Sequence, residues 1–149
     1  MASEINTAYD EMLAAFKTAW DAGAGAFNNG TIPEVRYDGV GKQGPPDGED
    51  PWARVTIRHV AGGQATLLGD AQVTRFRNSG IITVQVFYPL SRGGLASARS
   101  LAKVARSAYI GTSTASNIWF RNVRIVEVGP DGPWYNVNVL ADFEYDELV

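Results

Sequence analysis

The stretch Gly80–Tyr109, GIITVQVFYPLSRGGLASARSLAKVARSAY, decides the fold. Residues 80–88 are rich in β-branched and aromatic side chains, which predicts a well-buried strand. Pro89 cannot donate to a ladder of strands, and the glycine pair that follows frees the backbone, so the strand ends there. From Leu95 to Tyr109 the apolar spacing becomes helical. A central strand followed by a helix that folds back over it predicts the nucleus of a small α+β domain.

Composition indicates an ordinary globular chain. With 149 residues, 45% of them hydrophobic and 19% charged, we expect one domain over residues 1–149 that buries a real core. The net charge of −3 lacks the basic footprint of a nucleic-acid reader. The absence of cysteine excludes disulfides and thiolate metal sites. No apolar run reaches the roughly 18 residues of a membrane span, and no secretory signal opens the chain. We therefore expect a soluble protein made inside the cell, with no membrane contact.

An amphipathic helix is predicted at the N-terminus. Ser3 is a suitable N-cap, and Glu4 would lie at the positive end of the helix dipole. The apolar side chains recur every three or four residues; they are Ile5, Tyr9, Met12, Leu13, Phe16 and Trp20. Ordering such a helix costs more free energy than burying its stripe returns. The helix must therefore pack on a sheet or on another subunit.

Alternating and irregular segments follow. Residues 34–37 predict a short edge strand, and residues 39–51, rich in glycine and proline, predict a mobile surface loop. Residues 52–60 alternate between apolar and polar side chains, as a half-exposed antiparallel strand does. Residues 69–77 predict another strand, and residues 78–80 predict a tight turn that joins it to the central strand as a hairpin.

The C-terminal part predicts a second hairpin. Residues 118–128 and 134–145 have strand patterns, and the Pro-Asp-Gly-Pro segment at 130–133 is a turn by composition. The predicted order is α, β, β, β, β, α, β, β. The fold class is therefore α+β, a mostly antiparallel sheet with an N-terminal helix and a second helix packed on one face of it.

Two motifs have weak functional readings. The glycines at positions 39, 41 and 44 match a dinucleotide fingerprint, but Pro45-Pro46 follows where that fingerprint needs a helix. His59 is the only histidine, and no Gly-x-Ser-x-Gly or second nitrogen or sulfur ligand accompanies it. We expect a histidine at the margin of the core and no nucleotide, cofactor or metal site.

Asp142 and Glu144 point the same way on the last predicted strand. Glycosidase-like hydrolases use such a pair of carboxylates as their catalytic residues. The alternative is an acidic surface that awaits basic partners, and the sequence shows no cleft that would raise the pKa of either group. We expect no catalytic residues and no enzymatic activity, and we keep a small hydrolase as the less favoured alternative.

Aromatic and arginine side chains suggest a contact surface. Tryptophans stand at strand starts, where they either plug a core or anchor an interface. Arginine at this density on strand faces is common at polar interfaces. The residues that we expect at a subunit or partner interface are Trp52, Arg54, Arg58, Arg75, Arg77, Arg92, Trp134, Asp142 and Glu144.

Several segments together resemble the small tail terminator (tail completion) proteins of long-tailed bacteriophages, the group similar to the minor tail protein U of phage lambda. These segments are the helix with Tyr9, Phe16 and Trp20, WARV at 52–55, RNSGIITVQVFYP at 77–89, the glycines at 93–94, the helix with Leu101-Ala102, WYNVNV at 134–139 and FEY at 143–145. The resemblance covers most of the chain, and its motifs are structural rather than catalytic.

The resemblance implies a subunit of a homo-oligomeric ring, typically a hexamer, at the head-proximal end of the tail of a virion. Such a ring caps the tail tube, stops its polymerisation and offers a surface to a neck or head-completion protein. Its subunits are made in the host bacterial cytoplasm. DNA would pass through the lumen without specific binding, which the modest negative charge suits. Another neck or head–tail joining component is the alternative within the same class.

Overall fold

The structure is a computed structural model, and it describes residues 4–148 except 65–74. Two α-helices, two short 3-10 helices and five strands make up this part of the chain. Their bounds are α1 Ile5–Gly23, η1 Ala24–Phe27, β1 Glu34–Tyr37, β2 Trp52–Gln64, β3 Arg75–Pro89, η2 Leu90–Arg92, α2 Leu95–Ser107, β4 Trp119–Asp131 and β5 Trp134–Leu148.

The strands form one sheet in the order β1-β2-β3-β5-β4. All neighbours are antiparallel except β1, which pairs in parallel with the first four residues of β2. The predicted central strand lies in the middle as β3, flanked by β2 and β5. The predicted edge strand and the C-terminal hairpin of β4 and β5 are confirmed.

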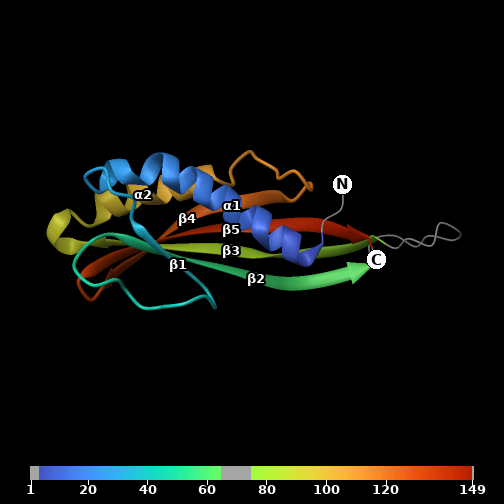
Figure 1. The fold of residues 1–149 in the computed structure, drawn as a ribbon, viewed down its shortest axis with the longest axis horizontal. Helices are drawn as coiled ribbons and strands as arrows, with labels where there is room; N and C mark the ends of the chain where they lie inside the picture. Colours follow the sequence, from blue (N-terminus) through green and yellow to red (C-terminus); the bar gives the residue numbers. More distant parts are fainter. Residues whose placement is uncertain (1–3, 65–74, 149) are drawn as a thin grey trace, which may run out of the picture.

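Both helices lie on one face of the sheet, as the sequence predicts (Figure 1). Small alanines of α2 allow it to approach the sheet closely, and they pack on the inward-facing valines and isoleucines of β2, β3 and β5. The buried side chains of α1 are Ala8, Met12, Phe16 and Trp20. The α+β prediction is therefore confirmed, and the opposite face of the sheet carries no helix among the described residues.

The start of α1 differs from the prediction in its cap. Glu4 is the N-cap residue, and its carboxylate accepts hydrogen bonds from the backbone N–H groups of Asn6 (3.0 Å) and Thr7 (3.3 Å). The acid satisfies two donors that a helix start leaves unpaired. Ser3, the predicted cap, lies outside the described residues. Ile5, expected in the apolar stripe, is 39% exposed.

The predicted turn at residues 78–80 is wrong. Residues 75–89 form the single strand β3, and Asn78, Ser79 and Gly80 pair with β2 on one side and β5 on the other. Gly80 lies where the backbones come very close: a β-carbon built there would stand 2.1 Å from the carbonyl oxygen of Arg58. The glycine thus serves a close approach between strands rather than a turn. The hairpin predicted between 69–77 and the central strand is therefore also wrong, and residues 69–74 of it lie outside the described residues.

His59 lies at the margin of the core, as predicted. Its Nε2 is 2.6 Å from the hydroxyl of Tyr145 and its Nδ1 is 3.4 Å from the hydroxyl of Tyr9, while the ring meets Phe143 edge to face. Burial lowers the pKa of the imidazole, and the nearby charge of Glu147 opposes this only in part. The neutral imidazole is therefore the form that the fold favours.

We expect stability to fall as the pH drops below the ordinary histidine pKa of about 6.5. The unfolded chain then takes up a proton that folded His59 resists, so this contribution is complete above about pH 6.5 and is lost below it. Because His59 is partly exposed, solvent limits the loss to about 1 kcal/mol or less. Urea unfolding between pH 7.5 and 5.5 measures it, and His59→Gln should flatten the pH dependence. An unchanged slope in His59→Gln would assign the effect to other groups.

Candidate interaction surface

The face of the sheet opposite the helices is the main candidate site. We call it the outer face. Strand alternation assigns these side chains to it: on β2, Trp52, Arg54, Thr56 and Arg58; on β3, Arg75, Arg77, Ile81, Thr83, Gln85 and Phe87; on β5, Trp134, Asn136, Asn138, Leu140, Asp142, Glu144 and Asp146; and on β4, Arg121 and Arg124. Eight of the nine residues expected at an interface lie on it. Arg92, the ninth, lies in η2 beyond the end of β3.

The arginines and acids of the outer face pair within one chain. Arg77 binds Asp146 at 2.8 Å and stands 3.6 Å from Glu144, which also pairs with Arg121. Two further pairs extend this ladder of charges: Arg124 with Asp142 at 3.4 Å, and Arg75 with Asp146 at 3.8 Å. The ladder runs across β3, β5 and β4, because residues paired across antiparallel strands share a face. The sequence predicted four of these residues, Arg75, Arg77, Asp142 and Glu144, at a subunit or partner interface.

Within this ladder, the arginine partners of Asp146 hold that acid in its charged form. A hydrogen bond from Arg77 lowers the pKa of Asp146; burial acts in the opposite direction, and the charges of Arg77 and Arg75 add to the lowering. The side chain of Glu144 is 12% exposed and that of Arg121 is 64% exposed, whereas Asp142 and Arg124 are about equally exposed. At Glu144 and Asp146, a partner that approaches this face therefore meets the guanidinium groups before it meets the carboxylates.

An aromatic cluster covers one end of the outer face. Trp52 stacks on Phe87 with ring centroids 4.3 Å apart, and Trp134 meets Trp52 edge to face at 6.3 Å. Trp52 and Trp134 are only 2% and 6% exposed, so the structure places both expected anchors inside a small second core. The indole N–H of Trp52 has no hydrogen-bond partner among the described residues.

The loop at residues 39–51 is tied to this same end of the sheet. Arg54 donates to the carbonyl oxygen of Gln43 at 2.7 Å, and Arg92 pairs with Asp50 at 3.2 Å. The hydroxyl of Ser91 donates to the carboxylate of Glu49 at 3.0 Å. Two expected interface arginines, Arg54 and Arg92, thus hold the loop of their own chain. Mobility of the loop stays a prediction.

The carboxylates considered for a hydrolase are both ion-paired. Asp142 accepts from Arg124 and Asn122, and Glu144 pairs with Arg77 and Arg121. A hollow of about 240 Å³ beside Asp142 is lined by the backbone and side chains of Val60, Ser79, Gly80, Ile81, Arg121, Asp142 and Phe143. Both carboxylates of the candidate pair thus already have ion-pair partners on neighbouring strands.

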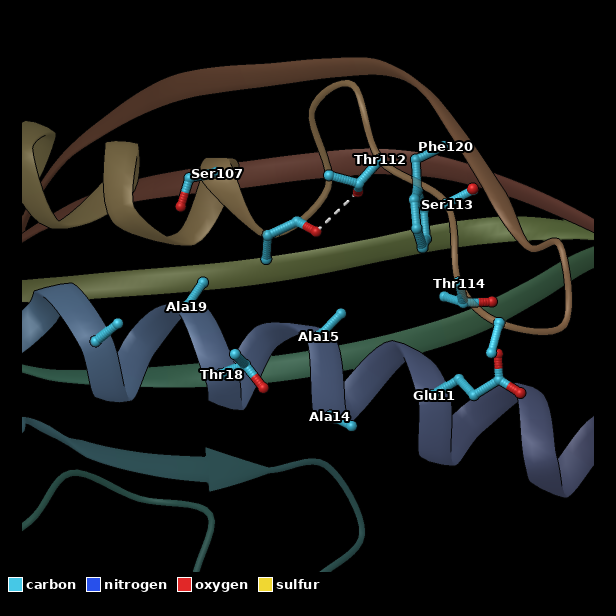
Figure 2. A pocket seen from close by; sticks show the side chains of 13 residues that line it. Glu11, Ala14, Ala15, Thr18, Ala19, Ser107, Thr112, Ser113, Thr114 and Phe120 are labelled. Atoms are coloured by element: carbon cyan, nitrogen blue, oxygen red, sulfur yellow. Dashed lines mark hydrogen bonds between the residues drawn. The ribbon is translucent and has the colours of Figure 1, made fainter.

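A groove on the helix layer was missed by sequence reasoning. It has a volume of about 530 Å³ and lies between α1 and the segment that follows α2, with the ring of Phe120 pointing into it (Figure 2). We call it the helix groove; its lining residues are Glu11, Ala14, Ala15, Thr18, Ala19, Ala22, Ser107, Ala108, Thr112, Ser113, Thr114, Ala115 and Phe120. Alanines and threonines at helical spacing were the only sequence signal, and they are equally typical of a solvent-exposed helix face.

Glu11 closes one end of the helix groove. Its carboxylate accepts a hydrogen bond from the backbone N–H of Ser116 at 3.0 Å and another from the hydroxyl of the same residue. Burial raises the pKa of Glu11, but the hydrogen bonds from Ser116 and Thr114 outweigh it, so the net shift is downward. This contact ties the 111–117 loop to α1 and fixes the width of the groove.

The described part of the chain holds no cluster of three or more histidine, cysteine or acidic side chains suited to a metal ion. Within the same residues, neither helix combines the length and apolar character that crossing a bilayer requires.

The fold defines a two-layer α+β protein, and two solved structures share it. One, known only by a sequence identifier, has a TM-score of 0.59 and 18% identity, with 92% of this chain and 94% of that chain covered. The other is a chain of the virion of a native gene transfer agent particle, with a TM-score of 0.50 and 17% identity over 89% of this chain and 98% of that chain. No protein-family profile matches the sequence, and no curated protein does. At these identities the likeness concerns the fold.

Proposed function

We propose that this chain is a structural subunit of a phage-like virion, and specifically a tail terminator that forms a ring on the end of the tail tube. The observation that carries the proposal is the fold, which nearly the whole chain shares with a chain of the gene transfer agent virion. The sequence segments that resemble tail terminators lie in α1, β2, β3, the glycines before α2 and its interior, and β5, which build the shared architecture. Because one fold can have many functions, the proposal also depends on the surfaces that this chain presents to its partners.

The mechanism that we propose is steric. A ring that occupies the end of the tube replaces its polymerising surface with a different one, which stops growth and offers a platform to a neck or head-completion protein. A cyclic ring needs two different patches on each subunit that complement each other. The outer face, which carries exposed guanidinium groups, and the helix groove are two different surfaces on opposite faces of the sheet.

Two alternatives differ in what they predict. Another neck or head–tail joining component would use the same surfaces but would bind the connector rather than the tube. A hydrolase would need Asp142 and Glu144 to act on a substrate, whereas both carboxylates are engaged in ion pairs with arginines of their own chain. We therefore favour a virion structural role without catalysis.

The test is to mix the purified protein with tail tube protein and to measure tube length by electron microscopy and binding by sedimentation. We expect the protein to bind tube ends and to limit their length. A chain that stays monomeric, does not bind tubes and leaves their length unchanged would contradict the proposal. Binding to isolated connectors but not to tubes would favour the joining-protein alternative.

A pair of charge variants locates the surface used. Arg75→Glu, on the outer face, should leave the fold intact and weaken tube binding or ring assembly about tenfold, with less dependence on salt than the wild type shows. Lys103→Glu, exposed on α2, makes the same change of charge on the helix layer and is the matched control. If Lys103→Glu weakens assembly as much, or if Arg75→Glu assembles normally, the outer face is not the contact surface.

A further inference from the structure

We propose that residues 45–50 of one copy of this chain dock into the hollow on the outer face of a second copy. This hollow is the volume of about 240 Å³ beside Asp142, and Val60 and Ile81 contribute apolar side chains to its lining. Val60 is 69% exposed, so an apolar group is left in solvent there. An apolar concavity surrounded by charged side chains has the layout of a protein interface, with an apolar centre and a polar rim.

The charges around the hollow favour an acidic occupant. Arg121 lines the hollow and its side chain is 64% exposed, and Arg77, which shares Glu144 with it, is 45% exposed. The residues assigned to the outer face include six arginines and three acids, whereas the whole chain carries a net charge of −3. A fitting occupant therefore combines a compact apolar group with carboxylates.

Residues 45–50, with the sequence PPDGED, have this combination. Pro45 and residues 47–50 are exposed, and the side chain of Asp50 is 70% exposed. A proline ring is rigid, so docking it costs little conformational entropy. The two other connections of more than two residues in the described part of the chain, 28–33 and 108–118, contain no charged residue. Among these loops, only the one that contains residues 45–50 can answer the arginines of the hollow.

The fold keeps this segment away from the hollow of its own chain. Glu49 and Asp50 are held by the side chains of η2, which follows the end of β3 at Pro89. Ile81, at the hollow, lies eight positions back along β3, about 26 Å from that end. Pro45 precedes Glu49 by four residues, so it can lie at most about 14 Å from it. The segment therefore meets the hollow of another copy rather than its own.

The contact is head to tail, because each copy offers its segment to one neighbour and its hollow to another. Such a heterologous contact closes into a ring or continues as a filament. The contact supplies an interface for the proposed ring, and it rests on the proposed function in one respect, the association of copies of the chain. It is tested without any tube protein, so a failure of this contact is distinguishable from a failure of tail capping.

A charge exchange followed by sedimentation velocity tests the pairing. Asp47→Lys in the segment and Arg121→Glu at the hollow should each weaken self-association at least about tenfold, because like charges then face each other. A mixture of the two variants should associate again, since every contact between unlike chains then pairs opposite charges. Asp10→Lys, at an exposed position on α1, makes the same change of charge outside both surfaces and should associate like the wild type. Circular dichroism checks that each variant is folded.

Disulfide trapping locates the contact independently and decides the question if Arg121→Glu does not fold, since the chain has no cysteine of its own. Pro45→Cys is mixed with isotopically labelled Val60→Cys under mild oxidation, and mass spectrometry counts the mixed disulfides. Thr31→Cys, exposed in the uncharged loop 28–33, replaces Pro45→Cys in the control. We expect the segment to cross-link at least about tenfold faster than the control, because docking raises the local concentration. Added salt should reduce this difference.

Four results would each overturn the contact: a monomeric wild type, equal cross-linking rates for Pro45→Cys and Thr31→Cys, a loss of association in Asp10→Lys as large as in Asp47→Lys, or a charge-exchanged mixture that stays dissociated. Association through the segment in a protein that ignores tubes would support the contact and remove the tail role. Capping of tubes by a protein whose Asp47→Lys variant self-associates normally would remove the contact and leave the tail role standing.

Discussion

Replacing Val84 by aspartate is expected to abolish folding. Val84 is 0% exposed in the middle of β3, where it pairs with Val55 of β2 and Val139 of β5 beneath the helices. No cation lies among these partners, so the carboxylate would be buried without a counter-charge, at a cost of several kcal/mol. That cost is comparable to the whole stability of a domain of this size, about 5–15 kcal/mol.

The measurement is the soluble fraction after expression, followed by circular dichroism and the dispersion of the amide NMR spectrum. Thr83→Asp is the matched control, because Thr83 is the neighbouring residue on the outer face and is only half-buried. We expect this control to fold with a loss of about 1 kcal/mol or less. A soluble Val84→Asp protein with a native spectrum would contradict the prediction, because it would show that the core accommodates a carboxylate at this position.

The replacement of Gly80 by alanine is expected to cost about 3 kcal/mol or more, a large effect for one methyl group. The added β-carbon would stand 2.1 Å from the carbonyl oxygen of Arg58 and 2.6 Å from the ring of Phe143. One obstacle is backbone within the ladder of β2 and β3, and the other is a buried ring, so neither can move aside freely. The register shift between His59 and Ala61 lies beside this point and would be the first feature to change.

Gly63→Ala is the control for this variant. Gly63 is on β2, and a β-carbon built there has no atom within 4 Å. Its replacement should be neutral or slightly stabilising, by up to about 1 kcal/mol, because alanine lowers the entropy of the unfolded chain. Urea unfolding of both variants gives the two free energies. Equal values for Gly80→Ala and Gly63→Ala would contradict the close approach at Gly80.

Much of the fold could be predicted from the sequence, because the spacing of apolar side chains along the chain indicates which segments form helices and which form strands. Alternation in β2 and β5 identified their inward faces, and helical spacing identified α1 and α2. The failure at residues 78–80 has a clear cause. Asn-Ser-Gly is typical of a turn. Glycine is also found inside strands, where the backbones of two strands approach closely. Only the position of the Arg58 carbonyl oxygen, which a distant segment supplies, shows that Gly80 has the second role.

The candidate site was less predictable than the fold. The sequence placed Trp52 and Trp134 among the interface candidates, with a role as core plugs as the alternative, and it placed the arginines and the two acids in the same set. In the structure the tryptophans cover each other, and Arg77 and Arg124 bind Asp146 and Asp142 of their own chain. Residue type shows that a side chain can form an ion pair or pack against another ring. Whether its partner comes from the same chain or from another copy depends on the order of the strands in the sheet.

The sequence by itself thus determined the fold class, the two helices, the central strand and the polar character of one sheet face, because these follow from periodicity along the chain. Only the tertiary structure decided that β3 runs unbroken from Arg75, that β5 pairs with β3, and that α1 and residues 107–120 enclose a groove. These features depend on which distant segments pack together. That choice is made by the burial of the whole core and the pairing of backbone groups, and no single stretch of sequence contains it.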